Sequence, residues 1–356
     1  MQILNFKLTF LTPAFLGDAA QNGRWRTPPI KHELRAWWRV AYAASKQFNF
    51  AASEMRKAEA LLFGHAWLEN DLNERGQTVA ARKSLVRLRL AHWQEGQLKQ
   101  AQWPRDITVQ HPEVRRNGQI TPVGSSLYLG YGPLEHRGGT ALKNNAAIQA
   151  GEASKLSLAL PQDRLPLIDK ALALMDRYGT LGGRSRNGWG SYALDPMDGT
   201  PAHSVDPLPL RRWQDALDLD WPHAIGKDEK GALIWRTEPQ NDWQSLMKTL
   251  ASLKIGLRTQ FVFLNPPGTL EDRHWLSYPV GTHPVSGWKN LGLRLPNQLR
   301  FKVRKTNDGR LVGVIFHMPH LPPPAFSPNR RVIESVWQKV HRFLDGQGQK
   351  LSRISA

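Results

Sequence analysis

The sequence predicts an α+β protein with two tandem ferredoxin-like domains, that is, RRM-like domains of βαββαβ order, with inserted loops. A length of 356 residues is enough for two domains that each bury a core. Apolar residues repeat with strand and helix periods in the order β-α-β-β-α-β along the first half. The second half is compatible with a degraded copy of the same arrangement, without a sequence repeat that would prove it.

Local patterns predict the elements of the first half. At the N-terminus, Leu4, Phe6, Leu8 and Phe10 alternate with polar residues, which is typical of a strand and unlike a signal peptide. Further strands are expected at residues 84–91, 126–129, 155–160 and 192–194, and helices at residues 30–48, 53–63 and 164–178. The polar, proline-punctuated segment 93–124 is interpreted as an inserted functional or partly disordered loop.

A proline-rich segment divides the chain. Residues 195–212 are interpreted as a linker between an N-terminal domain at residues 1–194 and a second domain at residues 213–356. In the second half, strands are expected at residues 231–236, 255–264, 299–305 and 310–318, and helices at residues 241–253 and 330–344.

Charge points to a polyanionic partner. The chain has 48 Lys and Arg against 30 Asp and Glu, a formal net charge of +18. Such an excess favours nucleic acid, although charge alone does not separate RNA from DNA or from an anionic membrane. The absence of cysteine excludes disulfides and thiolate metal sites and fits a reducing cytoplasm. No apolar run is long enough to span a bilayer, so no membrane partner is expected.

The glycine-rich stretch 178–192, YGTLGGRSRNGWGSY, is the main candidate site. Glycines let a backbone approach a ligand closely, and arginines provide planar donors for phosphate. A tryptophan can stack on a base or pack under the loop. The predicted RNA-binding residues here are Gly182, Gly183, Arg184, Ser185, Arg186, Asn187, Gly188, Trp189 and Gly190. Glycines also serve simple turns between a helix and a strand, but their combination with basic and aromatic residues favours polyanion binding.

The first predicted helix could extend this site. Lys31, Arg35 and Arg39 recur every four residues, and Trp38 lies alongside them. Arg24 and Arg26 lie just upstream, so basic and aromatic residues interleave as they do in single-strand binders. The alternative is an ordinary solvated helix face, because lysines and arginines normally face water and tryptophans normally pack.

Motifs for metal or nucleotide chemistry are missing from the sequence. There is no P-loop, Rossmann fingerprint, HExxH or EF-hand pattern. His317 and His320 are three residues apart, but Met318-Pro319 interrupts any helix there, and two ligands do not make a zinc site. We therefore expect no metal, no other cofactor and no catalytic residue. His32 could act as a general base in RNA cleavage, although a surface histidine is the simpler interpretation.

Four segments together resemble one family. They are Phe10-Leu11-Thr12-Pro13, the helix segment 34–39 (LRAWWR), Leu62-Phe63-Gly64 and the stretch GGRSRNGWGSY. In these motifs the chain resembles the RAMP superfamily of CRISPR-associated RNA-binding proteins over residues 1 to 194. The Trp-Trp-Arg helix and the two-half length are most similar to the first RAMP subunit of type III-B (Cmr) effector complexes.

The resemblance implies a non-catalytic RNA-binding subunit of a type III CRISPR effector ribonucleoprotein in antiviral defence. Its expected partners are guide RNA, complementary target RNA and other RAMP subunits. The glycine loop and the first helix would lie against guide or target RNA, which the sequence does not distinguish. The tryptophan in the loop and the basic segment 93–124 depart from the family pattern. Two alternatives stay open: a metal-independent endoribonuclease that processes guide RNA, and a structural subunit whose basic face meets acidic protein.

Overall fold

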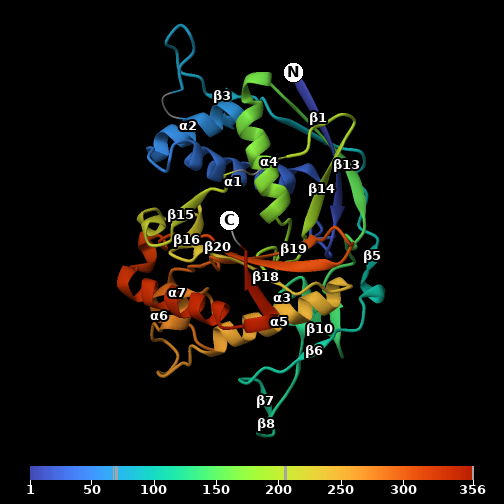
Figure 1. Ribbon diagram of the computed structural model, residues 1–356, viewed down its shortest axis with the longest axis vertical. Helices are drawn as coiled ribbons and strands as arrows, with labels where there is room; N and C mark the ends of the chain where they lie inside the picture. Colours follow the sequence, from blue (N-terminus) through green and yellow to red (C-terminus); the bar gives the residue numbers. More distant parts are fainter. Residues whose placement is uncertain (67, 69–70, 204–206, 355–356) are drawn as a thin grey trace. The chain divides into compact units, whose positions relative to one another are not determined.

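The computed structural model describes residues 1–66, 68, 71–203 and 207–354 (Figure 1). The chain divides into two compact units. Unit 1 comprises residues 1–98, 146–182 and 190–209; unit 2 comprises residues 99–145, 183–189 and 210–356. The units are therefore interleaved along the sequence, and the tip of the glycine-rich loop belongs to unit 2.

Unit 1 contains an antiparallel sheet whose strand order, among the described residues, is β14-β1-β13-β4. Its main elements are β1 (Gln2–Phe10), α1 (Thr27–Ser45), α2 (Ala52–Phe63), β4 (Arg87–Leu90), β13 (Ala153–Leu160), α4 (Leu165–Tyr178) and β14 (Tyr192–Met197). Helices α1 and α4 pack against each other on one side of the sheet (Figure 1). Leu4, Phe6 and Leu8 point toward this side and are at most 2% exposed, so the alternation in the sequence sets which face is buried.

Unit 2 contains a second antiparallel sheet, in the order β19-β20-β18-β21 within the described part of the chain. Its main elements are β18 (Ile234–Thr237), α5 (Trp243–Thr259), β19 (Leu299–Lys305), β20 (Leu311–His317), α7 (Arg330–Asp345) and β21 (Leu351–Arg353). Both helices begin at side-chain caps: Asp242 accepts a hydrogen bond from the Ser245 N–H, and Asn329 accepts one from the Val332 N–H. The connectivity of these main elements is strand–helix–strand–strand–helix–strand; unit 1 has the same order except that two helices, α1 and α2, follow its first strand.

The remaining elements are short. They are β2 (His65–Ala66), β3 (Ala81–Arg82), β5 (Leu98–Lys99), β6 (Thr108–Val109), β7 (Arg115–Arg116), β8 (Gln119–Ile120), β9 (Val123–Gly124), α3 (Ser125–Gly130), β10 (Leu134–His136), β11 (Thr140–Leu142), β12 (Ala146–Ala147), β15 (Leu210–Arg212), β16 (Ile225–Asp228), β17 (Gly231–Ala232) and α6 (Ser286–Asn290), besides single turns of 3₁₀ helix.

Two element predictions are wrong. The expected strand at residues 126–129 is helix α3, because the Asp106 carboxylate accepts hydrogen bonds from the N–H groups of Ser126 and Leu127 and so caps the helix N-terminus. A strand is also expected at residues 255–264, but residues 255–259 belong to helix α5, which ends at Thr259. Both errors arise because tertiary partners override a short local pattern.

The predicted domain borders at 194 and 213 stay a prediction. Residues 99–145 and 183–189 group with unit 2, although they precede the predicted linker 195–212. Strand β14 continues to Met197 and β15 begins at Leu210; residues 204–206 of the predicted linker lie outside the described residues.

Six described histidines are buried in unit 2, and three of them, His317, His320 and His341, lie in the C-terminal part of its core. His341 Nε2 lies 3.0 Å from His317 Nδ1, and His320 Nδ1 lies 3.0 Å from the Met318 carbonyl oxygen. Burial lowers the pKa of all three, to about 4 for His320 and about 3 for His341. They are therefore neutral core side chains at neutral pH.

We predict that unit 2 loses stability as the pH falls below the ordinary histidine pKa of about 6.5. Between that pH and the lowered folded-state values, the unfolded chain binds protons that the folded protein does not, so the free energy of unfolding decreases. At pH 5, His320 and His341 should each contribute a loss of about 2 kcal/mol relative to pH 7. Urea unfolding at several pH values across this range measures the free energy of unfolding.

Two variants test whether His341 contributes to this pH dependence of the unfolding free energy. His341→Asn should flatten the dependence of unfolding free energy on pH, whereas replacement of the exposed His136 by Asn should leave it as in the parent protein. An equal pH dependence for the parent and His341→Asn would contradict the assignment.

Candidate nucleic-acid interface

The base of the glycine-rich loop is a close-packed turn in unit 1. Leu181 donates its N–H to the Gly190 carbonyl, and Gly190 donates its own to the Pro13 carbonyl. Gly182 and Gly190 have φ of +94° and +63°, and a Cβ at Gly190 would lie 1.8 Å from the Leu181 carbonyl oxygen. Gly190 is thus required by the turn itself. The expectation that its N–H serves phosphate is wrong, because that N–H already has a partner.

The tip of the loop is attached to the sheet of unit 2. The Phe301 N–H on strand β19 donates to the Arg186 carbonyl over 3.0 Å. Within the tip, the N–H of Gly188 donates to the Ser185 carbonyl, so this glycine also provides no donor to a ligand. Arg184 has φ of +54°, a left-handed conformation that few non-glycine residues adopt. Such strain is typical of functional loops.

Trp189 is a core residue of unit 2 with 0% exposure. Its ring centroid lies 5.8 Å from that of Trp103 and 5.8 Å from that of Trp243. Of the two roles expected for this ring, the structure shows packing beneath the loop and not a ring exposed for stacking on a base.

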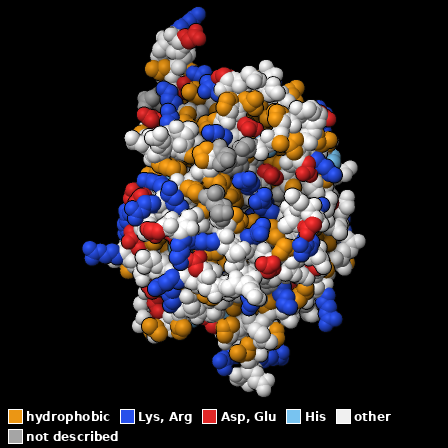
Figure 2. Space-filling model, viewed as in Figure 1, with side chains coloured by type: hydrophobic (Ala, Val, Ile, Leu, Met, Phe, Trp, Pro, Cys, Tyr) orange, Lys and Arg blue, Asp and Glu red, His pale blue; other side chains and the backbone are white. Residues whose placement is uncertain are grey.

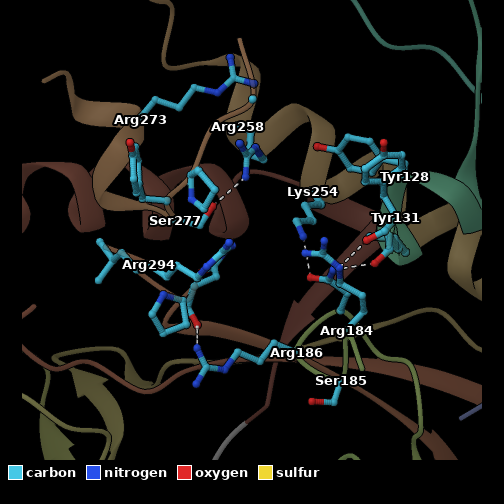
Figure 3. A pocket seen from close by; sticks show the side chains of 18 of the residues that line it. Tyr128, Tyr131, Arg184, Ser185, Arg186, Lys254, Arg258, Arg273, Ser277 and Arg294 are labelled. Atoms are coloured by element: carbon cyan, nitrogen blue, oxygen red, sulfur yellow. Dashed lines mark hydrogen bonds between the residues drawn. The ribbon is translucent and has the colours of Figure 1, made fainter. Parts of the chain in front are cut away.

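Next to this cluster, the tip of the loop lines a cavity of about 920 Å³ inside unit 2 (Figure 3). We call it the cationic cavity. Its basic lining residues are Arg184, Arg186, Lys254, Arg258, Arg273 and Arg294, and its aromatic or polar ones include Tyr128, Tyr131, Ser185, Asn187 and Ser277. Of the described residues that line it, none is an Asp or a Glu. A cavity of this composition selects for anions.

Two half-buried cations come from successive turns of helix α5. Lys254 Nζ donates to Asn187 Oδ1 over 2.5 Å, and Arg258 Nη1 donates to Ser277 Oγ over 2.9 Å. Burial lowers the pKa of Lys254 to about 7, and repulsion by Arg258 and Arg184 acts in the same direction. Burial also lowers the pKa of Arg258. Both shifts indicate positive charges that have less solvation than they would have in water.

The loop arginines are oriented by backbone carbonyls. Arg184 Nε donates to the Tyr131 carbonyl over 2.6 Å, and Arg186 Nη1 lies 3.5 Å from the Asn297 carbonyl oxygen. Figure 3 shows both side chains directed toward the hollow that Lys254 and Arg258 also face. The Tyr131 carbonyl orients Arg184 without cancelling its charge, whereas Arg273 is paired with a carboxylate, its Nη2 lying 2.8 Å from Glu113 Oε2.

The basic residues of helix α1 have partners within unit 1. Arg35 and Arg39 both bond the carboxylate of Glu59 on α2, at 2.8 and 2.7 Å, and Lys31 Nζ donates to the Phe63 carbonyl over 3.1 Å. Glu59 is only 5% exposed, so these contacts join the two helices. The predicted phosphate track of Arg35 and Arg39 is therefore first of all a helix–helix ion-pair cluster.

The other predicted residues of unit 1 are also engaged. Trp38 is 2% exposed and packs with Tyr42, so the hypothesis of a base-stacking ring at this position is wrong. Arg24 is exposed and lies 3.3 Å from Asp18, and Arg26 donates to the Gly17 carbonyl. Arg24 is the most accessible of the predicted cations here.

Unit 1 has its own small cavity, of about 480 Å³. Its lining includes Lys31, His32, Arg35 and Arg87. His32 is exposed, so it is available to solutes.

The open face of the unit 1 sheet lacks the stacking platform of RNA-binding RRM sheets. Lys7, Arg87, Arg89 and Lys155 face outward there, and no aromatic side chain does so in the described strands. The described strands of this face therefore present basic side chains without aromatic ones.

The sequence indicates the loop but not most of the cavity. Lys254, Arg258, Arg273 and Arg294 lie far from the loop in sequence, and residues 255–264 are predicted as a strand. Lys254 and Arg258 are four residues apart, which places them on one face of a helix. This spacing would have been informative if the helix predicted at residues 241–253 had been continued to Arg258.

Three further features concern all of the described residues: surface charge, groups of metal ligands and membrane-spanning helices. Lys and Arg side chains are more numerous than Asp and Glu on the face seen in Figure 2. No three His, Asp or Glu side chains in the described ranges are grouped as metal ligands would be. None of the helices described is long and apolar enough to cross a bilayer.

Comparisons with known proteins agree with the resemblance seen in the motifs. The sequence model of the RAMP superfamily matches residues 7–193. No curated protein matches the chain in sequence. Among solved structures, the chain is similar to apo Cmr1 from Pyrococcus furiosus, with 15% identity, a TM-score of 0.47, and coverage of 100% of this chain and 99% of that one.

Two further structures are similar at low identity. A chain of the type III-B Cmr-beta complex bound to cognate target RNA has 12% identity and a TM-score of 0.47, covering 95% of this chain and 99% of that one. A chain of a type IV-B CRISPR complex has 12% identity and a TM-score of 0.30, covering 58% and 94%. Because the superfamily's sequence model matches more than half of the 356 residues, this chain belongs to the RAMP superfamily.

Proposed function

We propose that this chain is a non-catalytic RNA-binding subunit of a type III CRISPR effector ribonucleoprotein, acting in antiviral defence. The observation that carries the proposal is the cationic cavity, where Arg184 and Arg186 of the glycine loop line one hollow with four further cations and no carboxylate among the described lining residues. RNA phosphates provide the compensating charge in this proposal. Membership of the RAMP superfamily favours RNA over other polyanions.

The proposed fold is a pair of tandem ferredoxin-like domains. The strand orders β14-β1-β13-β4 and β19-β20-β18-β21, each with βαββαβ connectivity, support it. In this proposal guide RNA and complementary target RNA are the ligands, and other RAMP subunits are the protein partners. The chain then takes the place of the first RAMP subunit of a type III-B (Cmr) complex, which its motifs resemble.

The loop arginines provide a direct test of RNA binding. Replacement of Arg184 and Arg186 by alanine should weaken single-stranded RNA binding and reduce the slope of log affinity against log salt by about 0.7 for each phosphate that the protein no longer neutralises. Filter binding at several salt concentrations measures the slope.

The control removes the same charge elsewhere in unit 2. Lys248 and Lys289 are exposed and do not line the cationic cavity. Their double replacement by alanine should change the slope less than the arginine pair does. If the two double variants behave alike, binding depends on net charge and not on the loop.

A second candidate function is metal-independent RNA cleavage. The observation that favours it is the unit 1 cavity, where the exposed His32 lies among Lys31, Arg35 and Arg87. A histidine base beside Arg87, a cation available to phosphate, is a workable arrangement for attack by a ribose 2′-hydroxyl.

A cleavage assay separates the two functions. The purified protein is incubated with repeat-containing RNA in EDTA. The proposed binding function predicts intact RNA. Specific cleavage that persists in His136→Ala and disappears in His32→Ala would instead establish the enzyme.

A further inference from the structure

We infer that the cationic cavity of unit 2 receives the phosphorylated end of an RNA strand, with a terminal phosphate monoester as the bound group. This inference rests on the proposed function, because it takes RNA as the ligand. It goes beyond that function in naming the chemical group that the cavity selects.

The charge density of the cavity favours a monoester. Six basic side chains, in the described part of the chain, line one cavity of about 920 Å³, and none of its described lining residues is acidic. One of the six, Arg273, is paired with Glu113, which does not line the cavity. An internal phosphodiester carries one negative charge, whereas a terminal monoester carries about −1.5 to −2 at neutral pH and has three strong acceptor oxygens. A cluster of convergent cations therefore compensates a monoester better than it compensates a run of diesters.

The partial burial of Lys254 and Arg258 favours an anion that enters the cationic cavity. Both side chains come from the same face of helix α5, and both donate to neutral acceptors, Asn187 and Ser277 (Figure 3). Two desolvated like charges on adjacent helical turns destabilise the protein unless an anion lies between them and the loop. The lowered pKa of Lys254 follows from the same burial and repulsion.

The size of the cavity favours a strand end. A track for a continuous strand spreads its cations along a surface, whereas ligand pockets typically enclose about 300–1,000 Å³. The cationic cavity falls in that range, which suits a strand end. Tyr131, at 65% exposure, carries the carbonyl that orients Arg184 and so lies beside the arginine, where a terminal base could stack.

A free nucleotide offers the same phosphate chemistry, so the test includes it. Calorimetry compares pentauridylates that have hydroxyls at both ends, a 5′-phosphate or a 3′-phosphate, together with ATP and inorganic phosphate. We expect one of the two monoester RNAs to bind about tenfold more tightly than the hydroxyl form, a difference equal to about 1.4 kcal/mol. ATP and phosphate should bind more weakly than that RNA.

Matched lysine variants test whether the preference for a monoester end depends on the cationic cavity. Lys254→Met should remove the preference for the monoester end, whereas Lys248→Met, on the exposed face of the same helix, should retain it. Arg258→Gln provides a second cavity variant should Lys254→Met fold poorly. Retained preference in a folded cavity variant would overturn the assignment to this cavity.

The outcomes separate this inference from the proposed function. Equal binding of all three RNAs overturns the inference and leaves RNA binding intact. ATP or phosphate that binds as tightly as the monoester RNA also overturns it, since the ligand is then a free nucleotide or ion. Failure of the parent protein to bind any RNA overturns the proposed function as well.

Discussion

The packing of Trp189 determines where the charged part of the glycine-rich loop can lie. With its indole against Trp103 and Trp243, the residues immediately before it have little freedom to move away from unit 2. The bond from the Phe301 N–H to the Arg186 carbonyl adds a second attachment, at the edge of the sheet. A loop that looks flexible from its glycine content is thus held at its tip by a large apolar contact.

This attachment has an electrostatic consequence. Because the tip cannot retreat, Arg184 and Arg186 remain beside Lys254 and Arg258, which lie on a helix that is itself packed in the core of unit 2. Rigid elements hold like charges at short range at a cost to folding stability. Such an arrangement is preorganised, since a bound anion meets donors that are already in position.

In unit 1, the arginines of helix α1 have an acidic partner. Arg35 and Arg39 share the almost buried carboxylate of Glu59, so their charge is compensated within the protein. Removing Glu59 would free two cations and also separate α1 from α2. Arg35 and Arg39, the central residues of the basic stripe on α1, therefore have a structural role. The accessible positive charge of this region lies at Arg24 and, on the open face of the sheet, at Arg87 and Arg89.

The sequence by itself determined the α+β class, the main strands and helices of the first half except α3, the hairpin at residues 299–318 and the match to the RAMP superfamily. These depend on local periodicity and on short motifs, which neighbouring residues encode. It also singled out the loop that lines the cationic cavity.

Only the tertiary structure decided what each site residue does. Whether Trp189 and Trp38 meet a base or a core depends on residues distant in sequence, such as Trp243 and Phe63. Likewise, Arg258, Arg273 and Arg294 join the loop only because α5 and the segments after it fold back onto unit 2. Burial and charge compensation are sums over all spatial neighbours, and a linear pattern contains only the nearest of them.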